Sequence, residues 1–108
     1  MSIVSFDTQL PKYAAPCERP VIQKAVDLCL WDSGTVSVWD GEELSVQRST
    51  DRTEILNNLA QTEMDQLEAY DKDGAMRGWF LLIYNNGSEH EPMVVISDYS
   101  VNDWTDNV

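Results

Sequence analysis

The segment from residue 76 to residue 84 constrains the fold more than any other part of the chain, because it is apolar on both faces. Side chains of an extended strand alternate between its two faces. One alternate set is Gly78, Phe80, Leu82 and Tyr84, and the other is Trp79, Leu81 and Ile83. Strands with this pattern are buried on both sides. The sequence therefore predicts that helices cover one face of this strand and that something else covers the other.

Several covers are compatible with the second face. The N-terminal arm offers Ile3, Val4 and Phe6, and the C-terminal tail offers Trp104. A second subunit or a partner protein would bury the same face, because exposed apolar patches commonly mark interfaces. The strand expected at residues 92–97 is also apolar on both faces, so the sequence leaves these alternatives open.

A first helix is expected to begin at Pro20, since proline is tolerated at the first helical position. Its apolar residues recur at a helical spacing and give one buried face. They are Val21, Ile22, Ala25, Val26, Cys29 and Leu30. The run Asp32-Ser33-Gly34 is expected to end the helix, with Gly34 as the C-terminal stop.

The residues on either side of Asp40-Gly41 alternate with period two, which predicts a β-hairpin over residues 35–47. The parity of the alternation selects the loop length. A three-residue loop with a left-handed Gly41 pairs Val36 with Leu44 and keeps the apolar side chains on one face, whereas a two-residue loop would divide them. The sequence therefore predicts the three-residue loop.

A second helix is expected after Asp51, which with Glu54 three residues later resembles a capping pattern. Its apolar stripe is Ile55, Leu56, Leu59 and Ala60. A meander of three strands follows, over residues 65–70, 76–84 and 92–97, with turns at 71–74 and 85–88. The predicted class is α+β: an antiparallel sheet of about five strands with two helices, in the order αββαβββ.

The 108 residues form one expected domain, with residues 1–19 as an N-terminal arm or loop and 100–108 as a polar tail. Nineteen acidic and seven basic residues give a net charge of −12. This balance argues against direct binding to nucleic acid or to an anionic membrane, because both need clustered Lys and Arg. The longest apolar run has six residues, far fewer than the roughly 20 of a membrane span.

Candidate chemical groups are few. His90 lies between Glu89 and Glu91 just after an expected turn, a setting too solvated for a metal site. Cys17 and Cys29 are too far apart for a CxxC motif, and their small number without a signal peptide indicates a reducing, cytoplasmic location. Asp71-Lys72-Asp73-Gly74 begins like a calcium loop but lacks its later ligands, so it is interpreted as a turn. We expect no enzyme activity, no cofactor and no metal.

The acidic residues are concentrated in the second half of the chain. Residues 54–108 contain eleven acidic and two basic residues. The predicted contact stripe is Glu63, Asp65, Glu68, Tyr70, Asp71 and Asp73, and a second patch is Trp39, Glu42 and Glu43. Aromatic side chains beside carboxylates are typical of interfaces that select a basic protein.

The leading hypothesis is a small acidic inhibitor that competes with nucleic acid for a basic surface on a nuclease or another nucleic-acid-handling protein. Anti-CRISPR, anti-restriction and nuclease-immunity proteins, from phages or other mobile elements, are of this type, and the comparison is based on charge, size and the lack of catalytic motifs. The alternative is a homo-oligomeric module, a dimer formed through the apolar face of residues 76–84, whose acidity serves solubility. A third hypothesis, a small enzyme, expects two carboxylates in a concave pocket.

Overall fold

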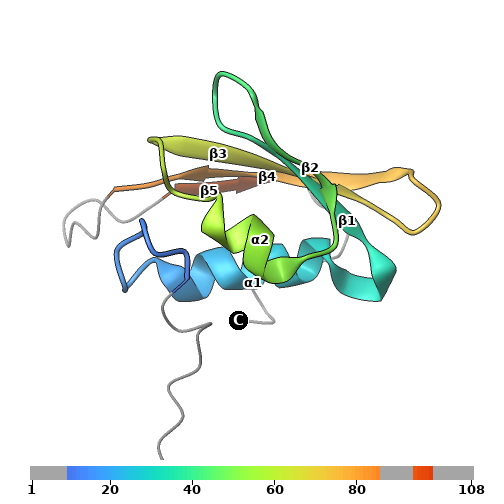
Figure 1. Ribbon diagram of the computed structural model, residues 1–108, viewed down its shortest axis with the longest axis horizontal. Coiled ribbons are helices and arrows are strands. Elements are labelled where there is room, and N and C mark those ends of the chain that lie inside the picture. Colours follow the sequence, from blue (N-terminus) through green and yellow to red (C-terminus); the bar gives the residue numbers. More distant parts are fainter. Residues whose placement is uncertain (1–9, 86–93, 99–108) are drawn as a thin grey trace, which may run out of the picture.

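The computed structural model of the protein describes residues 10–85 and 94–98. Two helices lie against one face of a five-stranded antiparallel sheet (Figure 1). The elements are α1 (Arg19–Cys29), the 3-10 helix η2 (Trp31–Ser33), β1 (Thr35–Trp39), β2 (Leu44–Ser49), α2 (Arg52–Asn57), β3 (Met64–Tyr70), β4 (Met76–Ile83) and β5 (Val94–Ser97). The predicted α+β class and the order αββαβββ are confirmed, with the short η2 as an addition.

The strands are ordered β2-β1-β3-β4-β5 across the sheet. The three strands predicted as a meander are present and pair as neighbours, and β1 inserts beside β3. β3 is therefore central: Leu67 lies opposite Val38 on one side and Phe80 on the other. All three side chains are fully buried, which fixes the register of the central strands.

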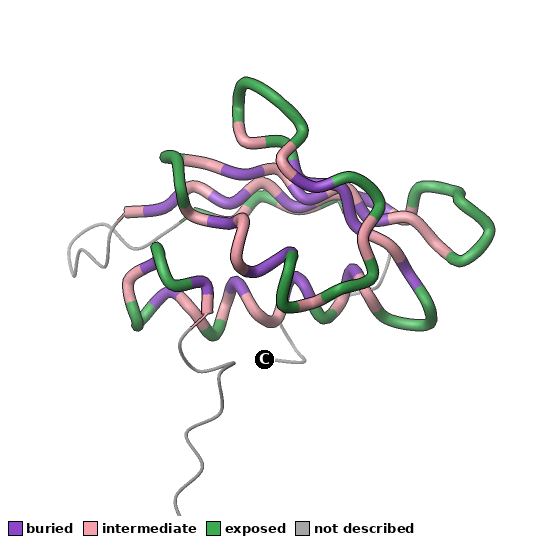
Figure 2. The backbone as a smooth tube through the Cα atoms, in the orientation of Figure 1, coloured by how far each residue is buried: buried purple, intermediate pink, exposed green. Residues whose placement is uncertain are grey.

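The core lies between the helices and the sheet (Figure 2). Its helical side consists of the stripes predicted from the sequence, with Ile22, Val26 and Cys29 from α1 and Ile55 and Leu56 from α2, all fully buried. The predicted cap is also present, because the Asp51 side chain accepts a hydrogen bond from the Glu54 N–H at 3.1 Å. In both helices, the apolar periodicity of the sequence agrees with the burial seen in the structure, and in α2 the predicted capping residue is present as well.

The end of α1 differs from the prediction. The helix stops at Cys29, and the left-handed residues that turn the chain are Asp32 (φ 52°) and Ser33 (φ 64°). Gly34 is extended, with φ −70° and ψ 161°. A Cβ at this position would collide with the carbonyl oxygen of Cys29, so glycine is needed here for close packing and does not act as a left-handed stop.

The β1–β2 hairpin also differs from the prediction. The Asp40 N–H donates to the Glu43 carbonyl at 3.1 Å, which closes a four-residue loop. Val38 pairs with Val46, and Trp39 pairs with Leu44, with register shifts between these pairs. The predicted pairing of Val36 with Leu44 is therefore wrong: a bulge at Ser45 brings Val46 to the helix side and sends Leu44 to the opposite side.

Candidate functional site

The face of the sheet that points away from α1 and α2, hereafter the open face, is predominantly apolar. Neighbouring strands place Leu44, Trp39, Gln66, Leu81 and Ile96 in one row across the sheet. Leu44 is 49% exposed and Ile96 is 46% exposed. The predicted two-sided character of β4 is thus present, with Trp79, Leu81 and Ile83 half-buried on this face. The covers proposed in the arm (Ile3, Val4, Phe6) and in the tail (Trp104) lie outside the described residues.

Part of the predicted contact stripe lies on the open face. Tyr70 donates a hydrogen bond from its hydroxyl to the Glu68 carboxylate at 3.3 Å. The guanidinium of Arg48 stacks 3.8 Å from the centre of the Tyr70 ring. Desolvation raises the pKa of Tyr70, and the neighbouring Glu68 charge adds to the increase. Arg48 therefore offsets the negative charge at this end of the open face.

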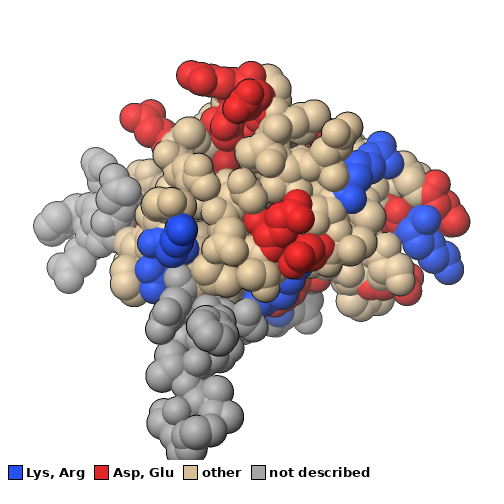
Figure 3. All heavy atoms as spheres, viewed as in Figure 1, with Lys and Arg blue, Asp and Glu red and all other residues tan. Residues whose placement is uncertain are grey.

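Four acidic residues lie on two loops at one end of the sheet. Asp40, Glu42 and Glu43 come from the β1–β2 loop, and Glu63 comes from the α2–β3 loop; we call this set the acidic end. Figure 3 shows acidic side chains gathered at the top of the view, where the β1–β2 loop lies. The Thr62 hydroxyl joins the two loops through a hydrogen bond to the Asp40 carbonyl at 3.1 Å. A shallow depression of about 340 Å³ lies between the loops.

Backbone hydrogen bonds fix the geometry of the acidic end. The Asp40 carboxylate accepts from the N–H groups of Glu43 and Glu42, both at 2.9 Å. These bonds lower the pKa of Asp40. Asp40 is thereby held as the ionised turn residue, and Glu42 and Glu43 remain exposed on the loop. The loop is well suited to presenting negative charge.

The predicted stripe does not form one surface. Asp71 and Asp73 lie in the β3–β4 turn, at the opposite end of β3 from Glu63, a separation of about 20 Å for a seven-residue strand. The Asp71 carboxylate is used within this turn, where it accepts from the N–H groups of Asp73 and Ala75 at 2.9 Å each. Glu63 instead joins Glu42 and Glu43 of the second predicted patch.

Asp65 is a correction to the predicted stripe, because its side chain is buried on the helix face of β3 and is only 1% exposed. Its Oδ2 atom accepts hydrogen bonds from the Tyr84 hydroxyl at 2.6 Å and from the Ala60 N–H at 2.8 Å. Burial raises the pKa of Asp65 to about 6, although both bonds oppose the increase. The period-two alternation of Asp65 with Leu67 and Ala69 already indicated this inward position.

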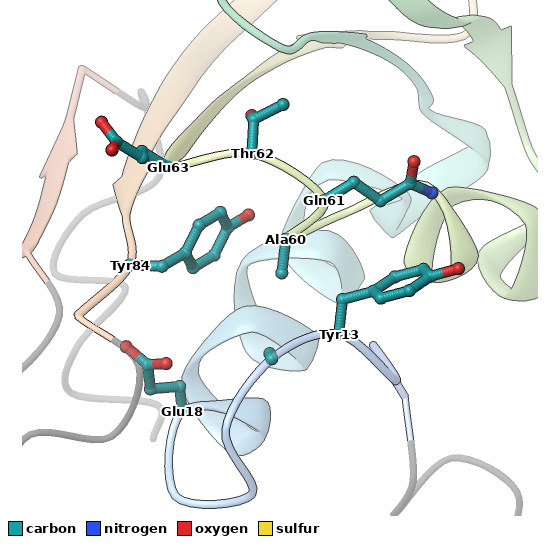
Figure 4. A pocket seen from close by; sticks show the side chains of 8 residues that line it. Tyr13, Glu18, Ala60, Gln61, Thr62, Glu63 and Tyr84 are labelled. Carbon is teal, nitrogen blue, oxygen red and sulfur yellow. The ribbon is translucent and has the colours of Figure 1, made fainter.

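A second acidic group, missed by the sequence analysis, lies near Tyr84. Glu18 is 4% exposed, and its Oε2 atom accepts from the Asn85 N–H at 3.0 Å. Glu18 and Tyr84 line a pocket of about 250 Å³ whose far wall is Tyr13 (Figure 4). Glu18 lies in a segment interpreted from sequence as a loop, and no periodicity there signals a buried carboxylate.

Within residues 10–85 and 94–98, no group of three or more His, Cys, Asp and Glu side chains is arranged to hold a metal ion. His90 and the turn at 86–88 lie outside that range. No helix in the described part of the chain is long and apolar enough to cross a membrane. Comparisons with models of protein families, with curated proteins and with solved structures found no match.

Proposed function

We propose that the protein is a small acidic inhibitor that occupies a basic surface on a nucleic-acid-handling protein. The observation that supports this most directly is the acidic end, where two loops separated in sequence bring Asp40, Glu42 and Glu63 around one depression, with Glu43 on the same loop as Glu42. No Lys or Arg is among the described residues that line the depression between these loops. A partner surface rich in Lys and Arg, of the kind that binds phosphates, has the matching charge.

Trp39 connects the acidic end to the open face. It ends β1, is 36% exposed, and is followed directly by Asp40. It lies in the same row as the exposed side chain of Leu44. Interfaces are commonly built from an aromatic or aliphatic centre with charged residues around it. Trp39 and Leu44 supply such a centre next to the carboxylates.

The proposed mechanism is steric and electrostatic. The net charge of −12 accelerates encounter with a basic surface, and the carboxylates of the acidic end then take the positions of nucleic-acid phosphates. Bound in this way, the protein excludes DNA or RNA without a chemical step. Such a protein would act as an anti-CRISPR, anti-restriction or nuclease-immunity protein. Asp65 is the carboxylate with the raised pKa, and it is enclosed in the core. Its raised pKa is therefore a consequence of burial and does not require a catalytic role.

The test uses a charge-reversed variant and a matched control. The test variant carries Glu42→Lys, Glu43→Lys and Glu63→Lys, and the control carries Glu54→Lys, Asp73→Lys and Asp98→Lys, which change the net charge equally at exposed sites away from the acidic end. Wild type and both variants serve as bait in lysate of the native host, with elution by salt.

The expected result is a nucleic-acid-binding protein that is recovered by wild type and control and lost by the test variant. With that partner purified, nucleic acid should compete with the wild-type protein, and the association rate should fall steeply as salt increases. A partner that binds the test variant as well as wild type, or an association rate that is independent of salt, would contradict the proposal.

The alternative function, a homo-oligomeric module, is favoured by one specific observation. Leu44, Val94 and Ile96 are each about half exposed on or beside the open face. Sedimentation velocity of wild type and of Leu81→Lys distinguishes the two functions. A wild-type dimer that becomes a monomer in Leu81→Lys supports the module, whereas a monomer in both leaves the open face free for a different protein.

A further inference from the structure

Glu18, which lines the pocket described above, carries an unsatisfied buried acceptor. Glu18 precedes α1 and is 96% buried, yet its Oε1 atom has no hydrogen-bond partner among the residues that the structure describes. The other carboxylate oxygen is held by the Asn85 N–H. A buried charged oxygen without a partner is costly and rare in folded proteins. A ligand that supplies a donor and a positive charge would remove this cost.

The walls of the pocket match such a ligand. They come from three parts of the chain, namely the segment before α1, the α2–β3 loop and the end of β4. Figure 4 shows Glu18 and Tyr84 on one side of the pocket and Tyr13 on the other, with the Glu63 carboxylate pointing away from Tyr84. The described lining residues include two carboxylates and no Lys or Arg. Tyr84 adds an aromatic ring, whose face attracts cations.

The hydroxyl group of Tyr84, which also lines the pocket, is already engaged. Its hydroxyl donates to Asp65, so it does not supply the missing donor to Glu18. Lys12 lies outside the lining set, with its Nζ atom 5.1 Å from the centre of the Tyr13 ring. The Arg19 guanidinium donates hydrogen bonds to the carbonyl groups of Pro11 and Lys12. Lys12 and Arg19, the two basic residues beside Tyr13 and Glu18 in the sequence, are thus committed elsewhere.

We infer that this pocket binds a cationic nitrogen group, with Glu18 as its anionic partner. The volume of about 250 Å³ is below the roughly 300–1,000 Å³ of sites for whole cofactors and suits a single head group. Because only one oxygen of the Glu18 carboxylate lacks a described partner, a compact ammonium matches better than the forked guanidinium, which pairs best with two free oxygens. The ammonium comes either from a small free amine or from a lysine side chain of another protein. The inference does not depend on the inhibitor function.

The experiment is a titration of the ¹⁵N-labelled full-length protein with n-butylammonium, followed by NMR. The Asn85 amide, which donates to Glu18, reports directly on the site. Butan-1-ol is the neutral control of the same shape. The wild-type protein is expected to bind the ammonium at least about tenfold more tightly than the alcohol, as for one charge-assisted hydrogen bond. Equal binding of the two, or no change at Asn85 with either, would overturn the inference.

Variants test the role assigned to Glu18. Glu18→Gln keeps the size and hydrogen-bonding capacity of the side chain and should weaken ammonium binding about tenfold. Glu54→Gln removes the same charge from an exposed position on α2 and should leave binding unchanged. Equal affinity in Glu18→Gln and wild type would reject Glu18 as the partner. The comparison of ammonium with alcohol needs only wild type, so it stands even where Glu18→Gln does not fold.

A second probe distinguishes the two sources. Lysine blocked at both its amino and carboxyl ends presents the same ammonium on a peptide-like backbone. Binding of blocked lysine and butylammonium with similar affinity supports the site and assigns it to a protein side chain. Binding of butylammonium alone supports the site and assigns it to a free amine.

Discussion

The Tyr84 hydroxyl donates a hydrogen bond of 2.6 Å to the Asp65 carboxylate inside the core, at the end of the sheet where β3 begins. The Oδ2 atom of this carboxylate accepts two hydrogen bonds, from Tyr84 and from Ala60, and the Oδ1 atom has no partner within the described part of the chain. Burial dominates, so the pKa of Asp65 is raised to about 6. The folded state therefore holds a proton in a pH range where the unfolded chain has released it.

Asp65 is expected to make the stability of the protein depend on pH. Because its folded pKa is higher than the unfolded value of 3.8, its contribution is most favourable at acidic pH and falls as pH rises from about 4 to about 6. Asp65→Asn removes this dependence. The difference in the free energy of unfolding between wild type and Asp65→Asn should shift by about 2–3 kcal/mol between pH 4 and pH 7, in favour of the variant. Urea unfolding at each pH measures it, and a constant difference would contradict the prediction.

Removal of the Tyr84 hydroxyl should raise the pKa of Asp65 further. Tyr84→Phe deletes the bond that favours the ionised carboxylate, so the loss of stability with rising pH should extend above pH 6. The variant should also be about 1–3 kcal/mol less stable than wild type at pH 7. Titration of the Asp65 carboxyl carbon by NMR reports the pKa. A lower pKa in Tyr84→Phe than in wild type would show that the hydroxyl is not acting as the donor.

Gly34 is expected to be intolerant of even one added methyl group. A Cβ at this position would meet the Cys29 carbonyl and the Arg77 side chain, so Gly34→Ala should destabilise the protein by about 1–3 kcal/mol. The adjacent Ser33→Gly is the control, because relief of the positive φ is offset by greater freedom in the unfolded chain and stability should stay within about 0.5 kcal/mol. Thermal unfolding compares the two, and equal melting temperatures for Gly34→Ala and wild type would contradict the steric argument.

The two cysteines should differ sharply in reactivity. Burial raises the pKa of the Cys29 thiol to about 12, whereas Cys17 is exposed. Only the thiolate reacts, so a thiol reagent at pH 8 should label one cysteine per folded chain and both cysteines in denaturant. Cys17→Ser should remove labelling of the folded protein. Rapid labelling of Cys29 in Cys17→Ser would show that α1 opens easily.

The sequence predicted the elements well because local and burial signals agree in most of this chain. The stripe of α1, the Asp51 cap and the strands β3 and β4 all follow from periodicity or from capping chemistry. The register of β2 does not, because the bulge at Ser45 is decided by packing: Val46 is buried against the core, and the parity argument assumed a regular ladder. Gly34 is likewise required by its close contact with the Cys29 carbonyl group, which the residues next to it in the sequence do not indicate.

The candidate site was predicted less completely for a related reason. Glu63, Asp65 and Asp73 are close together in the sequence, so they were predicted to form one stripe. Strand geometry separates them: Glu63 precedes β3, Asp65 points into the core, and Asp73 follows the other end of β3. The partnership of Glu63 with the β1–β2 loop depends on β1 lying beside β3, which the sequence did not indicate. The pocket at Glu18 joins three distant segments, and only the assembled fold brings them together.

The irregular pairing of β2 has a consequence for how copies of this protein meet. β2 is an outer strand of the sheet, and exposed outer strands invite pairing with another chain and growth into fibres. Its two register shifts, and the left-handed backbone at Arg48, interrupt the row of hydrogen-bonding groups that such pairing requires. The bulge in β2 thus protects this edge of the sheet from pairing with other copies, although the protein displays an apolar sheet face. The same bulge is the reason why the hairpin register differs from the prediction.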